Sequence, residues 1–301
     1  MISPSERVSV SLKTLVDLAA PATGLKFHHR AIRAKQSGGF TSRFKGRGME
    51  FDETRLYQAG DDIRSIDWRV TARTGKTHTK IFREERERPV FVSVDCRAAM
   101  HFATRGVFKS VLAKKIAALL AWTACHHGDR IGGQLFFDSH CVEFKPQNGR
   151  RAVLHFLNSL VNPPQFSTGL EPPFGGGDLE PALNRLVHHA RAGSLVYLIS
   201  DFRDLSENAQ NHLIKLARHC DVVLLFIFDP LEQNLPSGQY RFSDGKQDLT
   251  LNLGNQARLQ YQTQFLAKQE FLQNFARQHG MIFQSIHTQA NALDCLKLKS
   301  V

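Results

Sequence analysis

The sequence lacks a hydrophobic run long enough to cross a membrane. Apolar stretches such as residues 195–199 and 222–228 fall far short of the roughly 20 residues that a membrane-spanning helix needs. Cysteine is also scarce, because the five cysteines are widely separated, odd in number and never spaced as C-x-x-C. A zinc site, a redox motif and a disulfide framework are therefore not expected, and the sequence predicts a protein of the reducing cytoplasm.

Extremes of composition are absent as well. Of the 301 residues, 42% are hydrophobic and 22% are charged, which is close to the average of globular proteins and excludes a disordered or fibrous chain. Tryptophan (2) and methionine (4) are rare, whereas 22 phenylalanines predict a core of phenylalanine and aliphatic side chains. The length suits one large domain or two ordinary ones.

Basic residues outnumber acidic ones. The formal net charge is +11, and residues 1–88 carry 18 Lys and Arg against 11 Asp and Glu. Within them, the stretch 26–47 holds seven basic residues, two histidines and no acid. Such a stretch suits phosphate groups or an acidic protein surface. A solvated basic surface is equally compatible, because no aromatic ladder or recognition-helix pattern accompanies it.

The character of the sequence changes near residue 89. Residues 7–22 predict a short amphipathic helix, and residues 23–88 predict short strands joined by glycine-rich turns. From residue 89 onward, apolar β-type runs alternate with segments of helical periodicity. This alternation is typical of a mostly parallel sheet covered by helices on both faces. We therefore expect a helical and β-rich segment 1–88 and a doubly wound α/β domain 89–301.

Aspartates follow three of the predicted buried strands. Asp95, Asp201 and Asp229 each stand directly after an apolar run, and a glycine-rich stretch leads into a predicted helix at Asp178. Because parallel strands end at one edge of a sheet, where ligands of open α/β folds bind, these side chains are candidates for a Mg²⁺ site. The competing interpretation is that each aspartate caps a helix or binds loop amides.

Several short blocks, taken in series, resemble a known family. They are GRGMEF at 46–51, RLY at 55–57, GDDIR at 60–64, IDW at 66–68, TAR at 71–73, FREE at 82–85 and VD at 94–95. Their order and spacing are similar to those of the bacterial family called domain of unknown function 58. The resemblance is strong over about residues 25–140, and the predicted strand order of the remainder agrees with it.

The resemblance implies both a fold and a function. The fold is similar to a von Willebrand factor A domain, with a β-rich N-terminal extension. Genes of the family typically lie beside those of MoxR-type AAA+ ATPases. This implies a non-enzymatic adaptor that needs no cofactor and binds such an ATPase, or its client protein, in protein maturation or complex assembly. Since it argues from a fold to a function, this inference rests on analogy.

The same resemblance raises the question of a metal site. Von Willebrand A domains bind Mg²⁺ or Mn²⁺ through D-x-S-x-S after the first strand, a threonine in a second loop and an aspartate after a later strand. Here Arg97 and Ala99 replace both serines and Gly177 replaces the threonine. An arginine would also repel a divalent cation. We expect a site without metal that forms a partner-binding rim, comprising Asp95, Arg97, Gly177, Asp178 and Asp201.

Arg97 has a specific expected place within this rim. A guanidinium between Asp95 and Asp201 would make charge-assisted hydrogen bonds and occupy the position of the missing cation. A carboxylate of a partner would then dock on Arg97. An arginine that points into solvent is equally compatible with the sequence.

The segment 55–73 is dense in charge around one tryptophan. Arginine and aspartate at such density form bidentate pairs readily, which predicts a charge network that pins this segment to the α/β domain, with Trp68 packed inside. Removing that indole should then cost about 3–5 kcal/mol. An active site is the competing interpretation. The residues of this structural signature are Arg55, Tyr57, Asp61, Asp62, Arg64, Asp67, Trp68 and Arg73.

Two other functions remain open. The basic stretch 26–47 would suit a nucleic-acid-binding protein, whose affinity for random DNA would fall steeply with salt. Asp95, Asp201 and Asp229 together would suit a metal-dependent phosphohydrolase, which phosphatase and nuclease assays with Mg²⁺ and Mn²⁺ would detect.

Overall fold

The computed structural model describes residues 4–27, 49–84, 88–164, 178–236, 238–243 and 248–297. The chain divides into two compact units. The smaller is Ala31–Glu87, and the larger combines Met1–Arg30 with Arg88–Val301.

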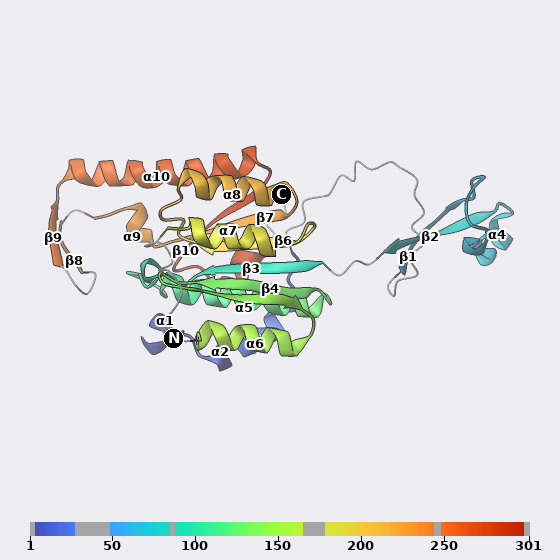
Figure 1. Ribbon diagram of the computed structural model, residues 1–301, viewed down its shortest axis with the longest axis horizontal. Helices are drawn as coiled ribbons and strands as arrows, with labels where there is room; N and C mark the ends of the chain where they lie inside the picture. Colours follow the sequence, from blue (N-terminus) through green and yellow to red (C-terminus); the bar gives the residue numbers. More distant parts are fainter. Residues whose placement is uncertain are drawn as a thin grey trace. The chain divides into compact units, whose positions relative to one another are not determined.

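A six-stranded sheet forms the centre of the larger unit (Figure 1). Its order is β10-β7-β6-β3-β4-β5, with β5 antiparallel at one edge and all other neighbours parallel. The predicted mostly parallel α/β fold is therefore confirmed. The strands are β3 (Pro89–Asp95), β4 (Arg130–Phe136), β5 (Cys141–Gln147), β6 (Leu195–Ser200), β7 (Asp221–Phe228) and β10 (Ile282–His287).

Helices cover both faces of this sheet, which is why its central strands are apolar on both sides. Val90, Val92 and Val94 of β3 belong to one core, whereas Phe91 belongs to the other. Figure 1 shows the two helical layers on opposite faces. The first core includes residues of α2 (Leu12–Asp17), α5 (Lys109–His126), α6 (Arg150–Val161) and α11 (Ala292–Leu296). The second includes residues of α7 (Glu180–His189), α8 (Glu207–Ala217) and α10 (Asn255–Gln278).

The N-terminal helices pack on α5. The indole Nε1 of Trp122 donates to the carbonyl of Leu15 at 3.0 Å, and Leu15 is fully buried. These contacts place α1 (Pro4–Val8), α2 and α3 (Ala19–Ala22) in the larger unit. The expected domain 1–88 is therefore wrong at its N-terminal part, because Leu15 of α2 and Ala22 of α3 are buried in the same core as α5. The division after residue 87 lies within one residue of the predicted boundary.

Two of the strands are each followed in the sequence by a short helix. The turn η2 (Ala98–Met100) follows β3, and α9 (Pro230–Gln233) follows β7. A hairpin is also present, since β8 (Gly238–Ser243) pairs antiparallel with β9 (Asp248–Leu253) before α10 begins.

The described part of the smaller unit is an antiparallel pair of strands, β1 (Met49–Leu56) and β2 (His78–Glu84). Between them lie η1 (Ile63–Ser65) and α4 (Trp68–Thr74). Gly75 ends α4 with a φ of 70°, a left-handed conformation that glycine adopts without strain.

Most acidic residues of the predicted charge network cap helices instead. Asp62 accepts from the backbone N–H of Arg64 at the start of η1, and Asp67 caps α4. One predicted ion pair is present, between Arg55 Nη2 and Asp61 Oδ1 at 2.6 Å. Charged side chains in this segment therefore mainly define where the short helices begin.

The prediction that Trp68 is packed inside is wrong. Its side chain is 67% exposed, and Leu56 and Ile63 in the same unit are exposed as well. Asp67 fixes the start of α4, so Trp68 occupies the first turn of a helix of only seven residues. Two strands and such a short helix provide too little surface to enclose an indole.

Trp68→Ala should consequently change the free energy of unfolding by no more than about 0.5 kcal/mol, as for other exposed positions. The matched control is Trp122→Ala, which removes a 2% exposed indole and should cost about 3–5 kcal/mol. Urea unfolding followed by far-ultraviolet circular dichroism measures both. Equal losses for the two variants would contradict the exposed position of Trp68.

Candidate functional site at the carboxyl edge of the sheet

Two of the predicted carboxylates meet at one edge of the sheet. Strands β3 and β6 are parallel neighbours, so Asp95 at the end of β3 and Asp201 just after β6 lie side by side. Both residues are buried, with exposures of 0% and 3%. Buried carboxylates need compensating charge or hydrogen bonds.

Arg97 supplies part of that compensation. Its Nε and Nη2 donate to the two carboxylate oxygens of Asp95 at 3.0 and 2.7 Å, and Nη2 lies 3.7 Å from Asp201 Oδ1. The backbone N–H of Arg97 also donates to Asp95, and its guanidinium lies over the ring of Phe136. The predicted position between the two aspartates is confirmed, whereas the solvent-exposed alternative is wrong.

A second buried cation, Lys109, completes the arrangement. It is the first residue of α5 and is 0% exposed, and its Nζ donates to Asp201 Oδ2 at 3.0 Å and to Glu232 Oε1 at 2.9 Å. Neither Lys109 nor Glu232 is among the residues predicted from the sequence. The one available signal was a lysine in the first turn of a largely apolar helix, where the helix dipole disfavours a cation unless an anion is near.

Polar groups from three other elements surround this cluster. Ser200 Oγ donates to Asp95 Oδ2 at 2.6 Å, and Lys268 Nζ of α10 donates to the carbonyl of Asp201 at 2.9 Å. Arg203 lies at the outer side, with Nη2 3.9 Å from Glu232 Oε1 and its side chain 55% exposed. The centre of the cluster is thus buried, and Arg203 is the member that is most exposed to solvent.

The pKa values of the two aspartates are shifted in opposite directions. Burial raises the pKa of Asp95, against the hydrogen bonds and charge of Arg97. Burial also acts to raise the pKa of Asp201, but Lys109, the backbone N–H of Arg203 and Lys268 together outweigh it, and the pKa lies below its ordinary value. Burial alone would lower the pKa of Arg97, yet Asp95 holds it above its ordinary value. Permanent positive charge is therefore built into the site.

The residues present do not suit a divalent cation. Each aspartate already binds a buried protein cation, and the hydroxyl of Ser200 is directed at Asp95. Among the described residues, no group of three or more His, Cys, Asp or Glu is arranged to hold a metal ion. A divalent ion would have to displace Arg97 and Lys109 against their charge.

The remaining predicted rim residues contribute less. Gly177 lies outside the described residues, and Asp178 accepts from the backbone N–H of Glu180 at the start of α7. Asp229 is held by Thr104 and Thr288 and caps α9 in a capping box. The capping interpretation is confirmed for Asp229, which does not join Asp95 and Asp201 in the cluster. A phosphohydrolase that uses all three aspartates is thus not favoured.

Arg97 itself offers a docking partner little accessible surface. Arg97 is only 2% exposed, and its guanidinium is engaged by Asp95. Next to the cluster lies a hollow of about 170 Å³. Its lining includes both cations and aromatic rings, namely Arg203, Lys268, Phe226, Tyr261 and Phe265. This hollow, rather than Arg97, is the accessible part of the site.

Comparison with known proteins identifies the family. Residues 53–271 match the family described as Protein of unknown function DUF58. The chain belongs to this family. Two curated relatives of the DUF58 chain are uncharacterized proteins, Rv1480 of Mycobacterium tuberculosis and Mb1516 of Mycobacterium bovis. Each is 31% identical over 191 residues, which cover 64% of this chain and 58% of the relative, so the chain spans little more than half their length.

Two solved structures resemble this DUF58 chain at low similarity. One is the conserved hypothetical protein BatB from Bacteroides thetaiotaomicron, with 12% identity, a TM-score of 0.41 and coverage of 66% of this chain and 90% of that one. The other is an aerotolerance-related membrane protein from Bacteroides fragilis, with 16% identity, a TM-score of 0.44 and coverage of 69% and 96%. In the described ranges of the present chain, no helix combines the length and apolar character needed to cross a membrane.

The structure describes little of the basic stretch that suits nucleic-acid binding. The basic stretch 26–47 lies outside the described residues from position 28 onward. Nucleic-acid binding by this stretch therefore stays a prediction.

Proposed function

We propose that this chain is a non-enzymatic protein-binding adaptor whose von Willebrand A-like rim works without a metal ion. The observation that carries the proposal is the pair of buried cations, Arg97 and Lys109, on Asp95 and Asp201. In a metal-binding A domain, a divalent ion would neutralise such carboxylates. Here the chain supplies the charge itself, so the rim is preset and independent of metal supply.

The partner in this proposal is inferred from the resemblance to the family. A MoxR-type AAA+ ATPase, or a client protein that it acts on, would bind at the carboxyl edge of the sheet. A cytoplasmic location is part of the proposal, since the five cysteines form no disulfide and two of them are buried.

The chemistry of the accessible hollow favours an acidic side chain of the partner. Arg203 and Lys268 present positive charge there, while Glu232 is already paired with Lys109. Phe226 and Phe265 add an apolar wall. A carboxylate on a short apolar stem would find charge and contact area together.

Calorimetry with the purified chain and the nucleotide-free ATPase of the same organism tests the proposal. We expect equal affinity in Mg²⁺ and in EDTA, and no heat of binding with Mg²⁺ or Mn²⁺ alone. Arg203→Glu should weaken binding about tenfold by reversing a charge at the interface, whereas Arg218→Glu, at the exposed end of α8, should not. Binding that disappears in EDTA, or micromolar affinity of the chain for Mg²⁺, would overturn the metal-free rim.

A further inference from the structure

Strand β5 is an edge of the main sheet. It pairs with β4 on one side, and no other strand of the described residues pairs with its outer side. An edge strand presents a row of backbone N–H and C=O groups that can hydrogen bond to another chain. The opposite edge of the same sheet is β10.

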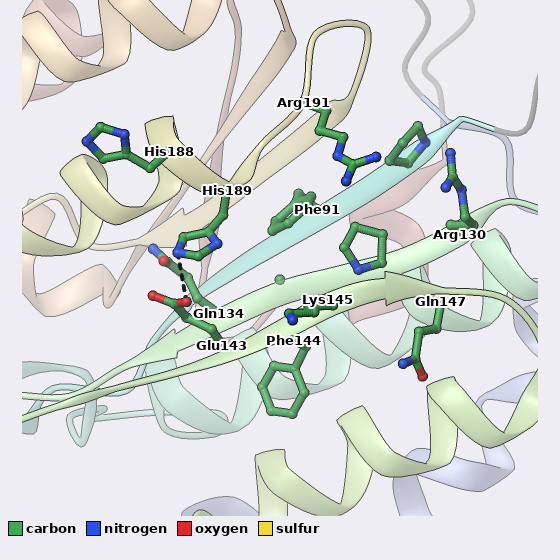
Figure 2. A pocket seen from close by; sticks show the side chains of 13 residues that line it. Phe91, Arg130, Gln134, Glu143, Phe144, Lys145, Gln147, His188, His189 and Arg191 are labelled. Carbon is green, nitrogen blue, oxygen red and sulfur yellow. Dashed lines mark ion pairs between the residues drawn. The ribbon is translucent and has the colours of Figure 1, made fainter.

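Two hollows flank β5, one on each face of the sheet. The hollow on the α7 side has a volume of about 640 Å³ and is shown in Figure 2. The hollow on the α6 side has about 290 Å³ and includes Ala152, His155 and Phe156 of α6. Both are lined by the same four residues of the edge strand, Glu143, Phe144, Lys145 and Gln147.

The sequence of β4 explains why the sheet is hollowed here. Gly132 and Gly133 lie at a register shift between β4 and β5. A Cβ at Gly132 would approach the carbonyl of Phe144 to 2.8 Å, and one at Gly133 would collide with the carbonyl of Val92. The two glycines allow close backbone approach and leave no side chain to fill the space.

The hollow on the α7 side is positively charged. Figure 2 shows Arg130 and Lys145 of the strands and Arg191, beyond the end of α7, around it. Glu143 is the one acidic lining residue, and it is already paired with His189 Nε2 at 2.8 Å and with Arg185 Nη1 at 3.3 Å. An acidic ligand group therefore meets attraction on this side.

The hollow on the α6 side has an aromatic wall. Phe144 points toward α6, away from the basic hollow (Figure 2), and contacts Phe156 and His155 with ring centroids 5.3 and 5.5 Å apart. Ala152 and Ile131 complete the apolar part of the lining. The two faces of the edge thus differ in the residues beyond β5, since Arg130 and Arg191 line only the hollow on the α7 side and Phe156 lines only the hollow on the α6 side.

We propose that β5 docks an extended peptide segment of a partner protein, which adds to the sheet as a further strand. Successive side chains of a strand point to opposite faces. A segment that alternates acidic and apolar residues would place its carboxylates toward Lys145, Arg130 and Arg191, and its apolar side chains toward Phe144 and Phe156. Main-chain hydrogen bonds supply affinity in this mode of recognition, and the flanking hollows supply specificity.

Two features of β5 restrict what can pair with it. Pro146 has no N–H to donate, so one ladder hydrogen bond is missing at this position of β5. Lys145 on the edge repels basic strands, a common protection of edges against unspecific association. This docking site shares no lining residue with the hollow beside Asp201, so it is a second site and does not depend on the rim proposed above.

Fluorescence anisotropy with short labelled peptides tests the proposal on the full chain. A peptide of alternating glutamate and valine should bind. Its counterpart with lysine for glutamate, and the glutamate peptide with methylated backbone nitrogens, should not. Hydrogen exchange should slow at amides of β5 when the peptide is present, and should not slow at β10, the other edge.

Charge reversal identifies the side of the strand. Lys145→Glu should weaken binding of the acidic peptide about tenfold, while Lys215→Glu, exposed on α8, should leave it unchanged. Equal binding of the lysine peptide, insensitivity to Lys145→Glu, or protection at β10 instead of β5 would each overturn the proposal. A dimer that the peptide dissociates would show that a second copy of this chain is the occupant, which would overturn it too.

Discussion

Replacement of Lys109 by methionine should lower the free energy of unfolding by about 3–5 kcal/mol, the usual cost of removing one partner of a buried ion pair. Lys109 is completely buried and bridges Asp201 and Glu232. Methionine fills a similar volume, so the loss reports the uncompensated carboxylates rather than a cavity. Urea unfolding at neutral pH provides the measurement.

Two further variants separate charge from packing. Lys115→Met lies on the same helix at a half-buried position and should change stability by less than about 1 kcal/mol. Adding Asp201→Asn to Lys109→Met should recover part of the loss, because it removes one of the two unpaired charges. A Lys109→Met protein as stable as the unmodified chain would contradict the bridging role of the lysine.

The dependence of stability on pH gives an independent check of the same contact. Lys109 makes the largest favourable contribution among the groups that outweigh burial and hold the pKa of Asp201 below its ordinary value of 3.8; the backbone N–H of Arg203 and Lys268 add to it. A carboxyl with a lowered pKa in the folded state stabilises the protein above its unfolded pKa, and this contribution disappears as the pH falls through the folded pKa. In Lys109→Met the acid-induced loss that belongs to Asp201 should be smaller. An unchanged slope below about pH 4 would show that Lys109 does not set this pKa.

The sequence predicts the larger fold because its signals are local and repeated. The short apolar run 222–228 predicts a buried strand and forms β7. The segment 255–279 repeats apolar residues at helical spacing and forms α10. Asp95 and Asp201 could be placed together because strands of one parallel sheet end at the same edge. These predictions need no knowledge of the packing between distant residues.

The failures all depend on contacts between distant residues. Lys109 has no visible partner in the sequence, because Asp201 and Glu232 reach it only through the fold. Trp68 carries no local signal for exposure, because exposure reflects how few elements surround α4. The N-terminal helices likewise join the larger unit through α5, more than 90 residues along the chain.

Replacement of Arg97 by serine should also destabilise the protein by about 3–5 kcal/mol and should create no metal site. The substitution restores one hydroxyl of the D-x-S-x-S pattern, yet it leaves Asp95 buried without its guanidinium. Lys109 would still form its ion pair with Asp201. Its ammonium group would repel an incoming Mg²⁺ at a distance of a few ångströms, where the interaction amounts to several kcal/mol in a partly buried site.

Calorimetry and unfolding experiments on matched variants decide this prediction. Arg203→Ser removes an arginine of the same cluster whose side chain is 55% exposed, so it should cost less than about 1 kcal/mol. Arg97→Ser/Ala99→Ser restores both serines and should still bind no Mg²⁺ or Mn²⁺ while Lys109 remains. If Arg97→Ser or Arg97→Ser/Ala99→Ser gained micromolar affinity for Mg²⁺, Lys109 would not be an internal replacement for the cation. If Arg97→Ser cost no more than Arg203→Ser, the buried pair with Asp95 would not be what holds the carboxyl edge of the sheet together.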